Sequence, residues 1–340
     1  MNKIDVLIVG STGYIGLELL KLLTNHKYIN IKYLCGNSSI GKKISYFDKR
    51  FKNKKLPKII KFNKKLLKNV DIVFTALPYG GSQKISKYLL KRNKLIDLSA
   101  DFRLTNKYDY IKWYKKKHIK PEYLTKSIYS LPELTNRNLK NYKIIACPGC
   151  YPTSILIPLI PLIKNKLIKY KNIIIDSKSG YSGAGRNVHE KYKNDNLYES
   201  IKPYGITIHR HNSEIQQELN IAGKKNVQFT FTPHLTPMFR GILSSIYVEL
   251  EKKSSINKIL SCLKKTYQNR YFIKIMKPNV ALSTNSVINT NFCNVSVNKT
   301  KHKDKIIIFS VIDNLIKGGS GQAIQNLNLL KNFDVKEGLI

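Results

Sequence analysis

Acidic residues are scarce in this chain. Its 340 residues include 21 Asp and Glu against 60 Lys and Arg, a formal net charge of +39. Such a balance often marks a nucleic-acid or anionic-membrane partner. Here only eight of the basic residues are arginine, and lysine is spread along most of the chain with abundant Ile and Asn, as in AT-rich coding sequences. With no zinc-finger or RNP motif, we expect no nucleic acid and no membrane among the partners.

Long apolar runs are also missing. The longest, near 155–163, is interrupted by Pro158 and Pro161, and none reaches the roughly 18 residues of a membrane helix. The N-terminus passes at once into a strand pattern without the layout of a signal peptide, so we expect a cytoplasmic protein. Cysteine is too sparse, at five in this length, for a secreted disulfide framework.

Strand and helix patterns alternate through the first half of the chain. Strand patterns cover 3–9, 31–35, 70–76, 95–98 and 142–146, and helical patterns follow at 15–23 and 81–91. This alternation predicts an α/β fold, a Rossmann-type doubly wound parallel sheet that binds a nucleotide. We place this nucleotide-binding domain at 1–149, completed by the C-terminal segment 313–340.

A glycine-rich loop directly follows the first strand. Its glycines form G-x-x-G-x-x-G, which permits a tight turn and close approach of a pyrophosphate to a helix N-terminus. An ordinary strand-to-helix turn is the alternative. The predicted dinucleotide-binding residues are Gly10, Ser11, Thr12, Gly13, Tyr14, Ile15 and Gly16.

The segment after the second strand, 35–43, contains no acidic residue. An Asp or Glu there would bind the ribose 2′-hydroxyl of NAD and repel a 2′-phosphate. Ser38, Ser39 and Lys42 are instead suited to receive that phosphate. The cofactor is therefore predicted to be NADP(H).

Period-two patterns appear in the second half. In 242–250, Ile242, Ser244, Ile246 and Val248 share one face, which predicts a mostly antiparallel sheet with one covered face. A helical pattern covers 256–267 and another 321–330. We therefore expect a second α+β domain over 150–312.

Cys150 is the candidate nucleophile. It follows the apolar run 144–146 within Cys147-Pro148-Gly149-Cys150-Tyr151-Pro152-Thr153, where a helix is predicted to begin. Pro158 and Pro161 are expected to interrupt this helix. The positive end of the helix dipole lowers the pKa of a thiol at that place. The alternatives are a redox pair with Cys147, a zinc site, which would need a second ligand pair, and a buried structural thiol. Oxidation joining Cys147 to Cys150 is a further hypothesis.

A thiolate nucleophile needs an acid/base partner, and His209-Arg210-His211 is the densest group of histidines. In an extended segment His209 and His211 would point the same way, just before a helix with Ser213 as N-cap and Gln216 completing a capping box. A solvent-exposed basic loop is the alternative, and no metal is expected.

A second glycine-rich loop, 179–186, ends in Arg186. Backbone N–H groups at Ser182 and Gly183 would bind an anion or allow a nicotinamide to lie close, and Arg186 would hold a phosphate. A flexible loop is the alternative.

The chain resembles the N-acetyl-gamma-glutamyl-phosphate reductases of arginine biosynthesis, type 1 subfamily. The matching segments run nearly end to end: GSTGYIG at 10–16, ALPYGGSQ at 76–83, LSADFRL at 98–104, YSLPEL at 129–134, CPGCYPT at 147–153, SGYSGAGR at 179–186, HRHNSEI at 209–215, PHLTPMFRGIL at 233–243 and DNLIKGGSGQAIQN at 313–326.

The resemblance implies roles for single residues. Cys150 is the nucleophile and His209 the acid/base. The NADP contacts include Gly13, Ser38, Pro78 and Asn314, and the substrate-pocket residues are Arg103, His211 and Arg240, beside the Arg186 already named. Tyr79 departs from the family, since a His is common there, and the segment after the second strand lacks an Arg that often contacts the 2′-phosphate.

The resemblance also implies a reaction and an assembly. Cys150 attacks the acyl phosphate of N-acetyl-L-glutamyl 5-phosphate, and NADPH reduces the thioacyl enzyme to the 5-semialdehyde, in a homodimer or homotetramer. Three other functions share many of these motifs: reduction of a carrier-linked aminoadipyl or glutamyl phosphate, aspartate-semialdehyde dehydrogenase, and a non-enzymatic nucleotide sensor.

Overall fold

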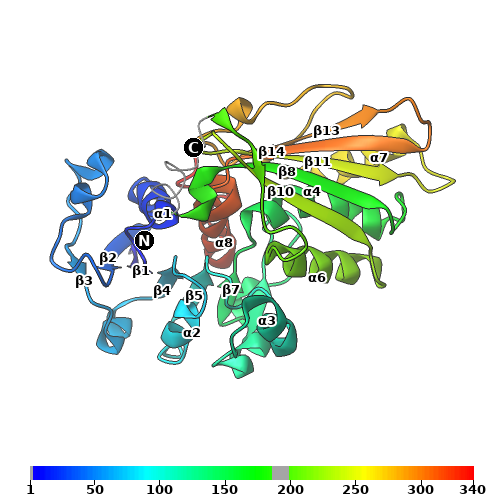
Figure 1. Ribbon diagram of the computed structural model, residues 1–340. Coiled ribbons are helices and arrows are strands. Elements are labelled where there is room, and N and C mark those ends of the chain that lie inside the picture. The colour runs from blue at the N-terminus through cyan, green and yellow to red at the C-terminus, as the bar shows by residue number, and fades with distance from the viewer. Residues whose placement is uncertain (1–2, 186–198) are drawn as a thin grey trace. The chain divides into compact units, whose positions relative to one another are not determined.

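The computed structural model describes residues 3–185 and 199–340 (Figure 1). The chain forms two compact units. The first ends at Pro148 and also contains Gly319–Ile340, and the second is Gly149–Gly318. No helix of the described residues is long and apolar enough to cross a membrane.

The first unit is built on a seven-stranded sheet in which every neighbouring pair is parallel. The strand order is β3-β2-β1-β4-β5-β7-β6. Its strands are β1 (Ile4–Val9), β2 (Ile29–Cys35), β3 (Ile59–Ile60), β4 (Ile72–Thr75), β5 (Lys94–Asp97), β6 (Ser127–Tyr129) and β7 (Ile144–Ala146), and its helices are α1 (Tyr14–Thr24), α2 (Gly81–Ser86), α3 (Lys107–Tyr114) and α8 (Gly321–Lys331).

The central strands of this sheet are apolar because both of its faces are covered. Val6, Phe74 and Ile96 are completely buried. Helix α8 packs on α1 and on β5, so the C-terminal segment completes this unit. The doubly wound parallel sheet expected from the alternating pattern is confirmed, while the short strand β6 and helix α3 were not predicted.

The predicted helix over 81–91 is too long. Helix α2 ends at Ser86, and the turn that follows it is held by the side chain of Asn93. The Asn93 side chain accepts a hydrogen bond from Leu90 N and donates to Leu67 O and Val70 O. A side chain that satisfies backbone groups in this way competes with helix continuation.

The second unit contains a seven-stranded mixed sheet in the order β12-β13-β14-β11-β8-β10-β9. Four of its six pairings are antiparallel, and β8 with β10 and β12 with β13 are parallel. Figure 1 shows the long strands of this sheet side by side. Its strands are β8 (Ile173–Gly180), β9 (Lys202–Pro203), β10 (Phe229–Thr236), β11 (Ile242–Glu249), β12 (Ile273–Ile275), β13 (Cys293–Lys299) and β14 (Lys305–Ile312), and its helices are α4 (Cys150–Lys164), α6 (His211–Gly223) and α7 (Ile256–Tyr267), with a π-helix at Ile316–Ser320.

The period-two pattern in β11 correctly predicts its buried face. Ile242, Ser244, Ile246 and Val248 are buried, whereas Tyr247 is exposed. Helix α4 packs against β11, α6 and α7 and covers this buried face. The mostly antiparallel second sheet is thereby confirmed.

Helix α4 corrects an expectation about proline. Pro158 and Pro161 were expected to interrupt the helix, but α4 runs unbroken from Cys150 to Lys164 and includes both. Almost all of its residues are buried, and Ile155, Leu159 and Leu162 are completely inaccessible. Tertiary packing on all sides outweighs the roughly 3 kcal/mol by which each internal proline disfavours a helix.

Candidate active site

The loop after β1 has the geometry of a nucleotide cradle. Gly10 has φ +88°, and a Cβ there would lie 2.3 Å from Ala76 O. A Cβ on Gly16 would lie 2.2 Å from Gly10 O. Only glycine fits at these two positions, which supports the reading of the motif. Gly13 is the N-cap of α1, so the first backbone N–H groups of that helix have no partner within it and suit a phosphate.

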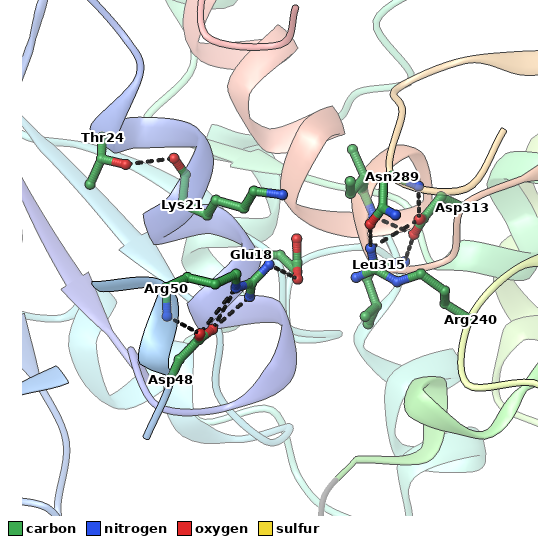
Figure 2. Close-up of polar contacts among 10 residues, drawn as sticks. Glu18, Lys21, Thr24, Asp48, Arg50, Arg240, Asn289, Asp313 and Leu315 are labelled. Carbon is green, nitrogen blue, oxygen red and sulfur yellow. Dashed lines mark hydrogen bonds and ion pairs between the residues drawn. The ribbon is translucent and has the colours of Figure 1, made fainter. Parts of the chain in front are cut away.

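The segment after β2 carries the two serines expected at the 2′-phosphate. Ser38 is exposed, and Ser39 is buried. Farther along, Arg50 donates to Asp48 at 2.6 Å and pairs with the buried Glu18 of α1 at 2.9 Å (Figure 2). These ion pairs connect the segment to the helix that follows the cradle.

The turn after β4, which contains the exposed Pro78, is held by Asp101. The Asp101 carboxylate accepts hydrogen bonds from Gly80 N at 2.5 Å and Ser82 N at 2.8 Å, and from the Tyr110 hydroxyl at 2.9 Å. Asp101 therefore caps the N-terminus of α2 from outside the helix. Asp101 lies within one of the motifs quoted above, but spacing gave it no role, because the backbone N–H groups that it caps at Gly80 and Ser82 are 21 and 19 residues away.

In the second unit, Cys150 is the first residue of α4, as predicted, and it is partly exposed. The N-cap, Gly149, donates its backbone N–H to Glu214 Oε2 at 2.9 Å. A Cβ on Gly318 would lie 2.7 Å from Cys150 Cβ. Cys150 therefore lies at a helix N-terminus, where the backbone before it is bonded to Glu214 and Gly318 packs closely on its Cβ.

The two histidines lie together, although not in an extended segment. His211 is the first residue of α6, and His209 precedes it in a turn. Their ring centroids are 4.8 Å apart, and both rings contact the buried Tyr151. The expected capping box is wrong, because α6 begins before Ser213, whose hydroxyl donates to Arg210 O.

His211 lies against the loop that carries Cys150. A Cβ on Gly149 would be 2.4 Å from His211 Nε2, and Glu214 Oε1 is 3.9 Å from the same nitrogen. Glu214 is completely buried. The Glu214 carboxylate therefore connects Gly149, the N-cap of α4, with the imidazole of His211. No role was predicted for Glu214 from the sequence, although the i, i+3 spacing places it on the same face of α6 as His211.

His209 occupies a drier position. Its Nδ1 accepts a hydrogen bond from His211 N at 3.2 Å, and its ring packs against Tyr151, Tyr204 and Phe231. Burial, and then the charges of the neighbouring His211 and Arg210, lower the pKa of His209 to about 2. His209 is therefore a neutral imidazole, and the bond accepted at Nδ1 places its proton on Nε2.

Arg240 and Asn314 belong to one buried polar group in the second unit, and Figure 2 shows Arg240 beside Asp313 and Asn289. Arg240 Nη1 lies 3.4 Å from Asp313 Oδ2 and also contacts Asn289. Asn314 Oδ1 accepts from Gly241 N at 2.7 Å, and its Nδ2 donates to Ser182 Oγ at 3.0 Å.

This polar group therefore brings together four predicted site residues from three segments. A Cβ on Gly183 would lie 3.4 Å from Asn314 Nδ2, so Ser182, Gly183, Asn314 and Arg240 share one region. Asp313, which organises the group, was not among the predicted residues, although it precedes Asn314 directly.

The remaining predicted residues are more scattered. Arg186 lies outside the described residues. Arg103 belongs to the first unit, where its guanidinium donates to Leu98 O at 3.0 Å. Cys147 is completely buried, and burial raises its thiol pKa to about 12. All five cysteines are free thiols.

Family models match most of the chain. One described as semialdehyde dehydrogenase, NAD binding domain, matches residues 5–142, and one described as semialdehyde dehydrogenase, dimerisation domain, matches residues 150–314. Curated N-acetyl-gamma-glutamyl-phosphate reductases are similar over nearly full length. That of Vesicomyosocius okutanii is 44% identical over 99% of this chain and 97% of the relative, and that of Clostridium beijerinckii is 43% identical over 98% and 96%. The chain belongs to the N-acetyl-gamma-glutamyl-phosphate reductase family.

Solved structures with a similar fold are named for a different activity, that of aspartate semialdehyde dehydrogenase. Aspartate semialdehyde dehydrogenase II of Vibrio cholerae matches with a TM-score of 0.73 and 19% identity over 97% of this chain and 99% of that one. The enzyme of Candida albicans, solved with NADP, matches with a TM-score of 0.69 and 15% identity over 97% and 99%. At these identities the structural likeness shows the fold, while the sequence relatives show the reductase family.

Proposed function

We propose that this chain reduces N-acetyl-L-glutamyl 5-phosphate to N-acetyl-L-glutamate 5-semialdehyde and phosphate with NADPH, through a thioester on Cys150. The observation that carries the chemistry is the position of Cys150 at the N-terminus of α4, beside His211 and the buried Glu214. Family membership over the whole chain supports the substrate. The relatives' names indicate N-acetyl-glutamyl phosphate rather than an aspartyl phosphate.

The first unit would hold the cofactor. The glycine cradle at 10–16 is a tight turn in which neither Gly10 nor Gly16 can carry a Cβ, and no acidic residue follows β2 to repel a 2′-phosphate. The structure solved with NADP shares this fold. When bound, the cofactor supplies the hydride. Contacts by Ser38, Ser39, Pro78, Ser182, Gly183 and Asn314 remain predictions.

Cys150 would act as the nucleophile. Its thiolate attacks the carbonyl carbon of the acyl phosphate, the C–S bond forms, and the bond from carbon to the phosphate oxygen breaks as phosphate leaves. The helix N-terminus favours the thiolate by its partial positive charge. The contacts of Gly149 and Gly318 fix the backbone and the Cβ of Cys150, and covalent catalysis benefits from such positioning.

We assign the acid/base role to His211 in preference to His209. His211 lies against Gly149 and faces the Glu214 carboxylate, which stabilises a protonated imidazole. The low pKa of His209 makes it a weak proton acceptor. Protonation of Nδ1 would also break the hydrogen bond that this nitrogen accepts from His211 N and bring two N–H donors together. His209 is then a positioning residue that caps α6 through His211 N. Arg103, Arg186 and Arg240 remain the predicted anion-binding groups for substrate.

A second copy of the chain is proposed to cover the outer face of the second sheet. Ile174 and Tyr247 face each other across β8 and β11 and are 50% and 41% exposed. They line a cavity of about 780 Å³ together with Phe229 and Ile307. The family model that matches this unit is described as a dimerisation domain. Light scattering should show a dimer or tetramer, and Tyr247→Asp should dissociate it.

Turnover assays test the function. Wild-type protein should oxidise NADPH with N-acetylglutamyl phosphate much faster than with aspartyl phosphate or a carrier-linked acyl phosphate. Cys150→Ser should still bind NADPH but lose nearly all turnover, whereas Cys262→Ser, at a partly exposed thiol outside the site, should retain it. Equal turnover with aspartyl phosphate would refute the substrate, and an active Cys150→Ser would refute the thioester.

A further inference from the structure

Three lysines lie side by side at one edge of the first sheet. Lys94 begins β5, Lys126 directly precedes β6, and Lys143 directly precedes β7. The backbone joins them, because Lys143 N donates to Lys126 O at 2.8 Å and Lys143 O accepts from Leu95 N at 3.1 Å. Neighbouring strands are about 4.8 Å apart, so three positive charges start from adjacent positions. This edge carries the amino ends of the strands, opposite the carboxyl ends that lead to Gly10.

Lys143 lies between the other two lysines, and its amine is held by hydrogen bonds. It is partly buried, and its Nζ donates to Leu90 O and, at 3.0 Å, to Lys91 O. The Lys94 ammonium is also held in place, donating to Lys140 O and Tyr142 O at 2.6 Å each. The like charges therefore cannot swing apart without losing these bonds.

This environment changes the chemistry of the Lys143 amine. Burial, and then the charges of Lys94 and Lys126, lower its pKa to about 8. Burial and the charge of Lys331 at the end of α8 also lower the pKa of Lys94. A neutral amine still has two N–H groups for the two carbonyls, so deprotonation breaks neither hydrogen bond and leaves a lone pair for reaction.

We propose that Lys143 is a reactive amine that acyl phosphates acylate without a second enzyme. The nitrogen lone pair attacks the carbonyl carbon, an amide bond forms, the bond from carbon to the phosphate oxygen breaks, inorganic phosphate leaves with that electron pair, and the amine proton goes to water. No oxidant or reductant is needed. The inference rests on the proposed function only in that the substrate of this chain is itself an acyl phosphate.

The test treats wild-type protein with acetyl phosphate from pH 7 to 10 and measures acetylation of each lysine by peptide mass spectrometry. At pH 8 about half of Lys143 is neutral, against roughly one part in 250 of an exposed lysine. Because lower basicity reduces nucleophilicity, we expect acetylation at least tenfold faster than at the exposed Lys140. Its pH profile should level off above pH 8, whereas exposed lysines should continue to rise.

Two variants separate a reactive site from simple exposure. Lys126→Gln removes one neighbouring charge and should slow the acetylation of Lys143 severalfold at pH 7.5 while leaving Lys140 unchanged. Lys143→Arg should abolish the fast site and keep reductase turnover, since this edge is remote in the sheet from the nucleotide cradle. Equal acetylation rates at Lys143 and Lys140, or an acetylation rate of Lys143 that is unchanged by Lys126→Gln, would overturn the proposal. Both acetylation measurements are independent of reductase turnover, so a failure of this proposal can be distinguished from a failure of the proposed reductase function.

Discussion

Gly149→Ala is the substitution that tests the site most directly. The added Cβ would lie 2.4, 2.8 and 2.9 Å from Nε2, Cε1 and Cδ2 of His211. The backbone of Gly149 has φ −68° and ψ 161°, which alanine adopts without strain. The substitution also keeps the N–H that donates to Glu214. Its effect therefore comes from displacement of one imidazole ring.

The size of the effect follows from the distances. Ordinary contact between a methyl carbon and a ring atom is about 3.5 Å, so the imidazole must retreat by about 1 Å. A misplacement of this size can lower the rate of a catalysed step about 10²-fold. The cost to stability is that of overpacking, about 1–3 kcal/mol, and the fold should survive.

The assay is steady-state NADPH oxidation with N-acetylglutamyl phosphate, together with the rate of Cys150 alkylation by iodoacetamide. Gly149→Ala should lower kcat about 10²-fold and slow alkylation. In a His211→Ala background the same substitution should cost almost nothing further, because the clash is gone. A wild-type kcat in the single variant, or an equal additional loss in the double variant, would refute the placement of His211 at the nucleophile loop.

Three further changes address neighbouring features. Gly318→Ala places a Cβ 2.7 Å from Cys150 Cβ and should reduce kcat at least tenfold, whereas a structural effect alone would lower the unfolding midpoint and leave kcat unchanged. Glu214→Gln keeps an acceptor for Gly149 N–H but removes the charge facing His211, so kcat should fall about tenfold or more and the acid limb of its pH profile should move. An unmoved pH profile would limit Glu214 to a structural role. Burial raises the pKa of Asp48, but its hydrogen bonds from Arg50 lower the pKa more, so the net shift is downward. The stability that Asp48 contributes is present above its unfolded pKa and lost as pH falls. Asp48→Asn should therefore cost up to about 1 kcal/mol at pH 7 and almost nothing near pH 2 in urea unfolding, and an equal cost at both would contradict the ion pair.

The periodicity of the sequence was sufficient to predict helices and strands where the local pattern and the tertiary packing favour the same structure. The helical pattern at 256–267 matches α7 residue for residue, and β1 differs from its predicted bounds by one residue. Both the parallel first sheet and the alternating burial of β11 followed from spacing alone. Cys150 was correctly placed at a helix start because an apolar strand pattern ends four residues before it.

The predictions that failed concern features of the structure that residues distant in the sequence determine. Pro158 and Pro161 are tolerated because α4 is enclosed on all sides, which no local rule can predict. The histidines lie at a helix start rather than in a strand, since His209 Nδ1 caps α6 and so replaces the expected Ser213 cap. The bond from Gly149 to Glu214 joins residues 65 positions apart, so spacing alone could not reveal it.

The first turn of α6 has a consequence for the energetics of turnover. His209, His211 and Glu214 are all fixed to this turn, and Gly149 is bonded to it. In the proposed mechanism a proton would move at His211 without a loop having to order or a side chain having to find its rotamer, because that entropy is lost once, during folding. The surrounding dipoles are likewise oriented in advance, so little reorganisation accompanies the change in charge. The catalytic barrier is thereby tied to the stability of one helix, and whatever makes this turn fray should slow the reaction before it unfolds the protein.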